Sequence, residues 1–324
     1  MAYIWYCSLT LTHKLSISSV LALSSVLFAC GAEEEAASQE DDATSARTQY
    51  VDIGQFVKDA DYEAWSAARR GLEQGFDNIC GDTFCGGDWS NLYSLGFTCS
   101  VSSKVGKVRE CLWTFAGSQE QVDGQTGAIS SSIGFFECRM KPTGNASALV
   151  NAFGADPLHA QLPGLQGEVY DQLYDCFENA IGAQPLPEYT EGTYADVLDV
   201  VQGDVYEQFF SATHNAHQAF DDVCGDTCCE GEYTNLQSLR LRCSQNDQGA
   251  LGECLWTIAG SDTRIDSRGW LKSTGAPFSC KIPVSGTAAD LAAALSPEDN
   301  GTPLFERKLP GSNESLNDAL GRCL

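Results

Sequence analysis

Apolar residues recur every three or four positions in two long segments of the chain, as they do on one face of an amphipathic helix. The first segment carries the stripe Trp65, Ala68, Leu72, Phe76 and Ile79. The second segment carries the matching stripe Phe209, Ala212, Ala216, Phe220 and Val223. Because two separate stretches keep one register, each pattern predicts a helix that packs on a core.

Alternation of apolar and polar residues follows each helix and predicts β-strands. The alternating stretches are residues 95–101, 111–115 and 136–140, matched by residues 239–243, 254–258 and 278–282. The connections between them are polar and contain no helical crossover. Each set therefore predicts a three-stranded antiparallel meander, with Trp113 or Trp256 on its inner face.

Two more helices are predicted after each set of strands. Asn145 and Thr287 are suited to cap a short helix, and each last helix carries an apolar face that includes Cys176 or Cys323. The order of one helix, three strands and two helices predicts an α+β domain. We expect its helices on one side of a small antiparallel sheet.

The chain is a tandem duplication. The segment FDNICGDTFCGGDWSNLYSLGFTC, residues 76–99, recurs as FDDVCGDTCCEGEYTNLQSLRLRC, residues 220–243. A length of 324 residues suffices for two domains of ordinary size. The predicted organisation is a signal peptide at 1–29, an acidic disordered tether at 30–49, cysteine-rich repeat 1 at 50–180, a linker at 181–193 and cysteine-rich repeat 2 at 194–324.

Twelve of the 15 cysteines form two matched sets of six. They are Cys80, Cys85, Cys99, Cys111, Cys138 and Cys176 in repeat 1, and Cys224, Cys229, Cys243, Cys254, Cys280 and Cys323 in repeat 2. An exported chain meets an oxidising compartment, so three disulfides per repeat are expected. Zinc is the alternative, but zinc sites need closely spaced ligand pairs that these sets lack.

Sequence alone leaves the pairing of these cysteines open. The preferred pairing in repeat 1 joins Cys85 with Cys99, Cys111 with Cys138, and Cys80 with Cys176. Cys228 has no cysteine counterpart in repeat 1, where Phe84 takes its place. We expect it to be a buried, reduced thiol, and a cross-link to a second chain or a bond to a small thiol are the alternatives.

The N-terminus carries an export signal. An apolar run from Leu15 ends in Leu27, Phe28, Ala29 and Cys30, which resembles the lipobox of bacterial lipoproteins. The resemblance implies cleavage before Cys30 and a lipid on its sulfur and amine, palmitate included. An uncleaved anchor and an ordinary secretory signal are the alternatives. Because no Asp follows Cys30, the resemblance also implies sorting to the outer membrane.

The chain is strongly acidic, with 44 Asp and Glu against 19 Lys and Arg and a formal charge of −25. This field repels nucleic acid and anionic headgroups, so no nucleic-acid partner is expected. Its simplest role is solubility, and attraction of cations or basic partners is the alternative. Residues 31–49 are acidic and lack large apolar side chains, which predicts a flexible tether between lipid and folded body.

Candidate chemistry is sparse. Asp82, Asp88, Asp226 and Glu232 in the cysteine loops are weak candidates for calcium, because they lack the spacing of an EF-hand. The aromatic residues Trp89 and Tyr233 could stack on a sugar, although burial beside a disulfide is the simpler interpretation. His214 and His217 have a spacing that could hold a metal, but repeat 1 lacks the pair, which favours a solvated helical face.

No catalytic motif of a hydrolase, metalloprotease or nucleotide-binding enzyme appears. We therefore expect a non-enzymatic lipoprotein of a bacterial cell envelope, without a cofactor, anchored in the membrane through Cys30. Its two domains would bind an extracytoplasmic partner or serve a structural role. The alternative is a carbohydrate-active or calcium-dependent surface protein. Because the positions shared by the copies have structural duties, function is expected where the copies diverge.

Overall fold

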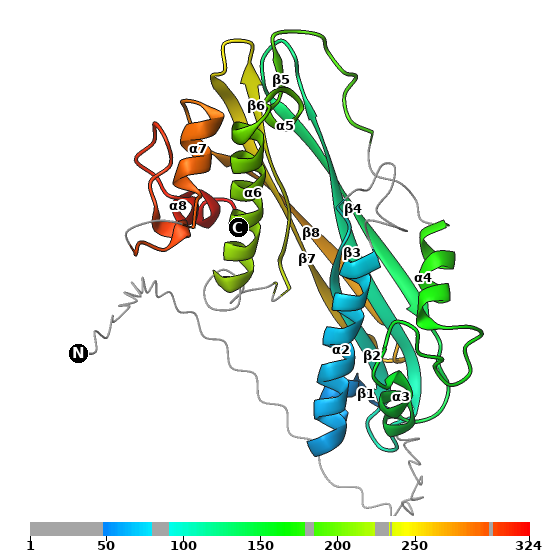
Figure 1. Ribbon diagram of the computed structural model, residues 1–324. Coiled ribbons are helices and arrows are strands. Elements are labelled where there is room, and N and C mark those ends of the chain that lie inside the picture. The colour runs from blue at the N-terminus through cyan, green and yellow to red at the C-terminus, as the bar shows by residue number, and fades with distance from the viewer. Residues whose placement is uncertain (1–47, 80–90, 179–184, 224–232, 234, 298–300) are drawn as a thin grey trace, which may run out of the picture. The chain divides into compact units, whose positions relative to one another are not determined.

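The fold is that of the computed structural model in Figure 1. It describes residues 48–79, 91–178, 185–223, 233, 235–297 and 301–324. Repeat 1 contains β1 (Tyr50–Asp52), α1 (Ile53–Phe56), α2 (Asp59–Ile79), β2 (Tyr93–Ser102), β3 (Val108–Val122), β4 (Ile129–Met140), α3 (Ala146–Phe153) and α4 (Val169–Glu178). Repeat 2 contains β5 (Tyr194–Asp196), α5 (Val197–Val200), α6 (Asp204–Val223), β6 (Gln237–Asn246), β7 (Leu251–Ile265), β8 (Leu271–Ile282), α7 (Ala288–Ala294), the 3-10 helix η3 (Leu304–Glu306) and α8 (Leu316–Gly321).

The predicted α+β class is confirmed, but each sheet has four antiparallel strands rather than three. The orders are β1-β2-β3-β4 and β5-β6-β7-β8. The additional strands β1 and β5 are three residues long and pair only with the far ends of β2 and β6. A strand this short shows no alternation, so the sequence pattern could not reveal it.

Helices cover one face of each sheet and enclose a core (Figure 1). The predicted stripes of α2 and α6 are buried there, and so are Trp113 and Trp256. Each indole N–H donates to a serine on the neighbouring strand, Ser94 or Ser238, at 2.8 Å. The inner faces were thus predicted correctly, and the indole of each tryptophan keeps the hydrogen bond that burial requires.

The predicted N-caps are also confirmed. The side chain of Asn145 accepts the Ala148 N–H at the start of α3, and Thr287 forms a capping box with Asp290 at the start of α7. The last helix of repeat 2 is shorter than predicted. It ends at Gly321, so Cys323 lies in the turn that follows, where its N–H bonds the Leu320 carbonyl.

Eight of the twelve matched cysteines lie in the described part of the chain, and these eight form four disulfides. Cys99 joins Cys111 and Cys138 joins Cys176, and repeat 2 joins the equivalent residues, Cys243 with Cys254 and Cys280 with Cys323. The preferred pairing was therefore wrong. Cys99 and Cys111 lie directly opposite each other on β2 and β3, a register that spacing alone does not give. Cys80, Cys85, Cys224, Cys228 and Cys229 lie outside the described residues.

The two sheets pack on each other through the faces that their helices leave open. Thr114 of β3 lies 3.3 Å from Ser261 of β7, and Ser118 of β3 lies 2.9 Å from Thr257 of β7, hydroxyl to hydroxyl. Thr114 is equivalent to Thr257 and Ser118 to Ser261. Equivalent surfaces of the two repeats therefore contact each other, as identical surfaces do at the two-fold interface of a homodimer.

The β-hairpin tips extend this pseudo-symmetry. The Ser100 hydroxyl donates to the Gly269 carbonyl at 2.5 Å, and the equivalent Ser244 donates to Gly127 at 2.6 Å. Both glycines have positive φ, and a Cβ at either would lie 2.6 Å from a tyrosine ring of the other repeat. Glycine is needed at both tips for its backbone conformation and for this close approach.

Candidate ligand-binding cleft

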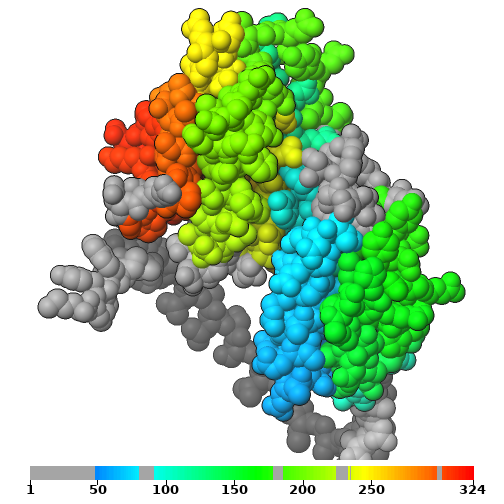
Figure 2. Space-filling model, viewed as in Figure 1, coloured from blue at the N-terminus to red at the C-terminus, as the bar shows by residue number. Residues whose placement is uncertain are grey.

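A hollow of about 640 Å³ lies between α6 and β6. We call it the α6–β6 cleft. Its wall on one side is the face of α6 that carries Phe210, Thr213 and His214, and on the other it is β6. Asn91 and Tyr93 of repeat 1 complete it. Figure 2 shows α6 and α2 on the same side of the molecule, with atoms of both sheets visible between them.

Two faces of helix α6 carry apolar side chains. One is the predicted core stripe, and the other turns aromatic side chains outward. Tyr206 and Phe210 are one turn apart, their rings stack nearly parallel at 6.2 Å between centroids, and they are 36% and 53% exposed. Large exposed aromatic side chains cost hydrophobic free energy, so their presence beside a hollow is typical of a binding surface.

His217 links the cleft to the other repeat. Its ring lies 5.1 Å from that of Tyr93, centroid to centroid, and its side chain is 22% exposed. Burial, with a smaller contribution from nearby His214, lowers the pKa of His217. His214 is exposed, as the predicted solvated face requires, whereas His217 is half-buried. Among the described residues, no group of three metal-ligating side chains forms.

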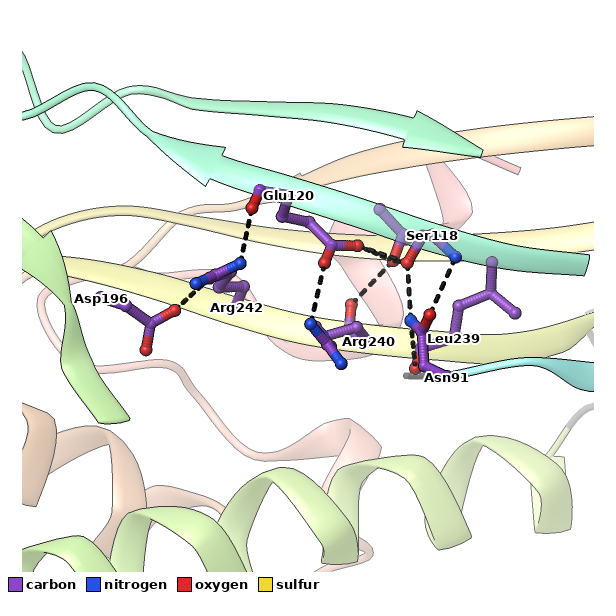
Figure 3. Close-up of polar contacts among 8 residues, drawn as sticks. Asn91, Ser118, Glu120, Asp196, Leu239, Arg240 and Arg242 are labelled. Atoms are coloured by element: carbon purple, nitrogen blue, oxygen red, sulfur yellow. Dashed lines mark hydrogen bonds and ion pairs between the residues drawn. The ribbon is translucent and has the colours of Figure 1, made fainter. Parts of the chain in front are cut away.

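The floor of the cleft holds two arginines of β6 (Figure 3). Arg240 lies 3.5 Å from the carboxylate of Glu120, a β3 side chain that is 0% exposed. Arg242 pairs with Asp196 and donates to the backbone carbonyl of Glu120 at 2.6 Å. Each guanidinium thus has a carboxylate partner, and the floor is close to charge-balanced.

Repeat 1 has an equivalent but smaller hollow between α2 and β2, about 350 Å³ in volume, which we call the α2–β2 groove. Its side chains differ from those of the cleft. Ser66 replaces Phe210, Arg70 replaces His214, and Gly96 replaces Arg240. The scaffold is shared and the lining is not, so the cleft is a place where the two copies diverge.

Carboxyl groups of both repeats gather next to Tyr93. Burial, then Glu73 and then Asp221, raise the pKa of Asp77 to about 6. Burial also raises the pKa of Glu73 and of Asp221, and burial with the charges of Asp77 and Asp221 raises that of Tyr93. Asp77 and Asp221 are equivalent residues of α2 and α6, so the pseudo-symmetry brings two like charges together.

Stability is expected to rise as the pH falls from 7 towards 4. The pKa of Asp77 is about 6 when folded, against a usual 3.8, so the folded state binds the proton more tightly and acidification favours it in that window. Urea midpoints at pH 7 and pH 5 measure this. Asp77→Asn should reduce the difference between the two urea midpoints. Asp247→Asn, which removes an exposed charge elsewhere, should leave this difference unchanged. If Asp77→Asn shows the same difference between the two urea midpoints as the wild-type chain, the raised pKa of Asp77 is not the cause of the pH dependence.

The calcium candidates Asp82, Asp88, Asp226 and Glu232 lie outside the described residues, as do Cys30 and Trp89. Tyr233 packs against the repeat 2 core, with its ring edge-on to Phe278 at 6.2 Å, which agrees with burial rather than a sugar platform. Sequence reasoning missed Tyr93, Phe210 and Arg240. The signal that could have found them is the non-conservative difference at Phe210 and Arg240 between two otherwise aligned copies.

No protein-family model, curated protein or solved structure matches this chain. Within the described part of the chain, no helix combines the length and the apolar character needed to cross a bilayer.

Proposed function

We propose that the protein is a lipid-anchored binding protein of a bacterial cell envelope and that the α6–β6 cleft is its ligand site. The observation that carries this proposal is the divergence of one hollow on a duplicated scaffold. Phe210, His214 and Arg240 line it, where the equivalent groove has Ser66, Arg70 and Gly96. Positions with structural duties are shared by both copies, whereas the residues that line this hollow differ between them. This difference supports a function at the lining.

The size and composition of the cleft support a binding role. A volume of about 640 Å³ falls within the usual range of ligand sites. Aromatic rings at Phe210 and Tyr93 offer apolar contact, and paired guanidinium and carboxylate groups offer both donors and acceptors. The proposal assigns no catalytic step and no cofactor.

Attachment to the membrane rests on the lipobox that ends at Cys30. A lipid there and the acidic tether of residues 31–49 would hold the folded body away from the bilayer, in the outer membrane under this proposal. The partner would then be extracytoplasmic.

Capture from a solubilised extract of the cell envelope tests the ligand site. The full chain should retain a specific component, and Thr213→Trp should lose it, because an indole on α6 would fill the cleft. Arg69→Trp is the matched control, since Arg69 occupies the equivalent position in the α2–β2 groove. Cys30→Ala should move the chain from the membrane fraction to the soluble fraction.

Two outcomes would contradict the proposal. One is that the wild-type chain retains nothing specific, and the other is that Thr213→Trp and Arg69→Trp retain the component equally well. Thermal unfolding of both variants shows whether they are folded. Loss of capture is interpreted only for a variant that unfolds at the wild-type temperature. If Thr213→Trp unfolds at a lower temperature, Phe210→Ser, which installs the repeat 1 residue, is used in its place.

The carbohydrate-active alternative is favoured by one observation. Asp77, with a pKa of about 6, lies near Asp221, and glycosidases use a carboxyl that stays protonated together with one that is ionised. Release of reducing ends from oligosaccharides by the full chain, abolished by Asp77→Asn, would support hydrolysis over binding.

A further inference from the structure

We infer that the α6–β6 cleft holds a neutral oligosaccharide chain, whose sugar rings lie against Phe210 at one end and Tyr93 at the other. The inference rests on the proposed ligand site and names its ligand class.

Aromatic side chains mark the two ends of the stretch of α6 that lines the cleft. Phe210 is 53% exposed, and its ring is nearly parallel to that of Tyr206. His217 and Tyr93 line the other end, with their rings 5.1 Å apart between centroids. Phe210 and His217 are seven residues apart, so they share a face of α6 and are separated by about 10 Å along its axis. This separation is close to the length of a disaccharide.

Polar side chains lie between and beside these rings. The flat face of a sugar ring carries C–H groups that pack on an aromatic ring, while its hydroxyl groups need hydrogen-bond donors and acceptors. Thr213 and His214 line the cleft between Phe210 and His217, and Asp199 also lines it. His214 and Asp199 are exposed. Together an imidazole, a hydroxyl and a carboxylate offer both donors and acceptors to a sugar.

The charge of the lining favours a neutral ligand. The charged side chains that line the cleft are two arginines and two aspartates, Arg240, Arg242, Asp196 and Asp199. An ionised ligand would be attracted by one pair and repelled by the other, whereas hydroxyl groups bind to both without adding a charge. An acidic polysaccharide would also be repelled by the net charge of −25.

The comparison between repeats singles out the rings. The α2–β2 groove is built in the same way, with two side chains from the other repeat, Asn235 and Gln237, where the cleft has Asn91 and Tyr93. Three ring positions of the cleft carry no ring in the groove: Phe210, His217 and Tyr93 correspond to Ser66, Glu73 and Gln237. Since these positions come from both repeats and differ in the same sense, contact between rings and ligand explains the difference.

Calorimetric titration of the full chain tests the inference. The probes are cellohexaose, maltohexaose, chitohexaose and the neutral polysaccharide of the cell envelope, freed of protein by proteolysis. At least one should bind saturably at millimolar concentration. The monosaccharide of that probe should bind about tenfold or more weakly, because it covers the rings at only one end. Hexagalacturonate, which is anionic, should bind more weakly than the neutral chain.

Variants of the rings test where the sugar lies. Phe210→Leu keeps an apolar side chain but removes the ring, and should weaken binding about fivefold, while Phe210→Tyr should retain it. Tyr93→Gln installs the equivalent residue of repeat 2 and should weaken binding to a similar extent. Tyr62→Ala, which removes an exposed ring from α2, is the matched control and should leave the affinity unchanged. Thermal unfolding identifies the folded variants, and Phe210→Leu decides if Tyr93→Gln unfolds at a lower temperature.

The inference is overturned if none of the four probes binds, if Phe210→Leu binds as tightly as the wild-type chain, or if the monosaccharide or hexagalacturonate binds as tightly as the neutral chain. If the component captured from the envelope is a protein that Thr213→Trp loses, the inference fails while the proposed ligand site stands. If Thr213→Trp and Arg69→Trp bind every probe and every captured component equally well, both fail.

Discussion

Replacing Glu120 with alanine is expected to lower the free energy of unfolding by about 3 kcal/mol, at the lower end for a broken buried ion pair. The Glu120 carboxylate is fully buried and accepts hydrogen bonds from Ser118 and, at 2.9 Å, from Thr257 of the other repeat. Its removal takes away the acceptor that these two hydroxyls share, although Thr257 can still donate to the Arg240 carbonyl at 3.2 Å. Because the Arg240 side chain is 33% exposed, its guanidinium can turn to water, which limits the loss.

Urea unfolding measures this change. Glu120→Gln keeps the shape and part of the hydrogen bonding, and should cost about 1 to 2 kcal/mol. The control is Thr263→Ala, at the equivalent position in β7, which should cost less than about 1 kcal/mol. A double-mutant cycle with Arg240→Ala isolates the ion pair, and a coupling of zero would show that the carboxylate acts through the hydroxyls alone.

Loss of the disulfide between Cys138 and Cys176 is expected to lower stability by about 4 kcal/mol, from the entropy of closing its 38-residue loop. The bond ties α4 to β4, so helix docking should loosen as well. Replacing Cys280 and Cys323, which close a 43-residue loop, should have a similar effect, because the loss depends only weakly on loop length.

Denaturant unfolding of the two double alanine variants under non-reducing conditions checks the size of the loss. Peptide mapping of the unreduced chain checks the pairing. A fragment linking Cys138 to Cys176 is expected. A fragment linking Cys80 to Cys176, the pairing preferred from sequence, would contradict the structure. Stability unchanged in both variants would show that the bonds close loops already ordered in the unfolded chain.

The helices and inner strand faces were predictable because side-chain direction is local. The stripes from Trp65 to Phe76 and from Phe209 to Phe220 keep one helical period, and the second copy repeats the pattern with partly different residues. Strand pairing was less accessible. The Cys99 and Cys111 bond depends on which residues lie opposite across β2 and β3, and β1 is too short to show a pattern.

The candidate site was harder to predict for a related reason. The period of α6 reveals the face that packs on the core, but Phe210 and His217 lie beside that face, where their surroundings depend on other segments. Tyr93 reaches His217 from the other repeat, and Arg240 meets Glu120 across the two sheets. Comparing the copies showed where they differ, and only the folded chain showed that these positions border one cleft.

The sequence by itself determined the duplication, the α+β class, the helix stripes and the inner faces of both sheets, since each depends on periodicity within a short segment. The tertiary structure decided how the repeats meet. Glu110, Thr114 and Ser118 on the open face of β3 are polar and yet buried, because the other repeat supplies their partners. A buried polar side chain is stable only when such a partner is in place, and the partners here lie in the other copy of the repeat.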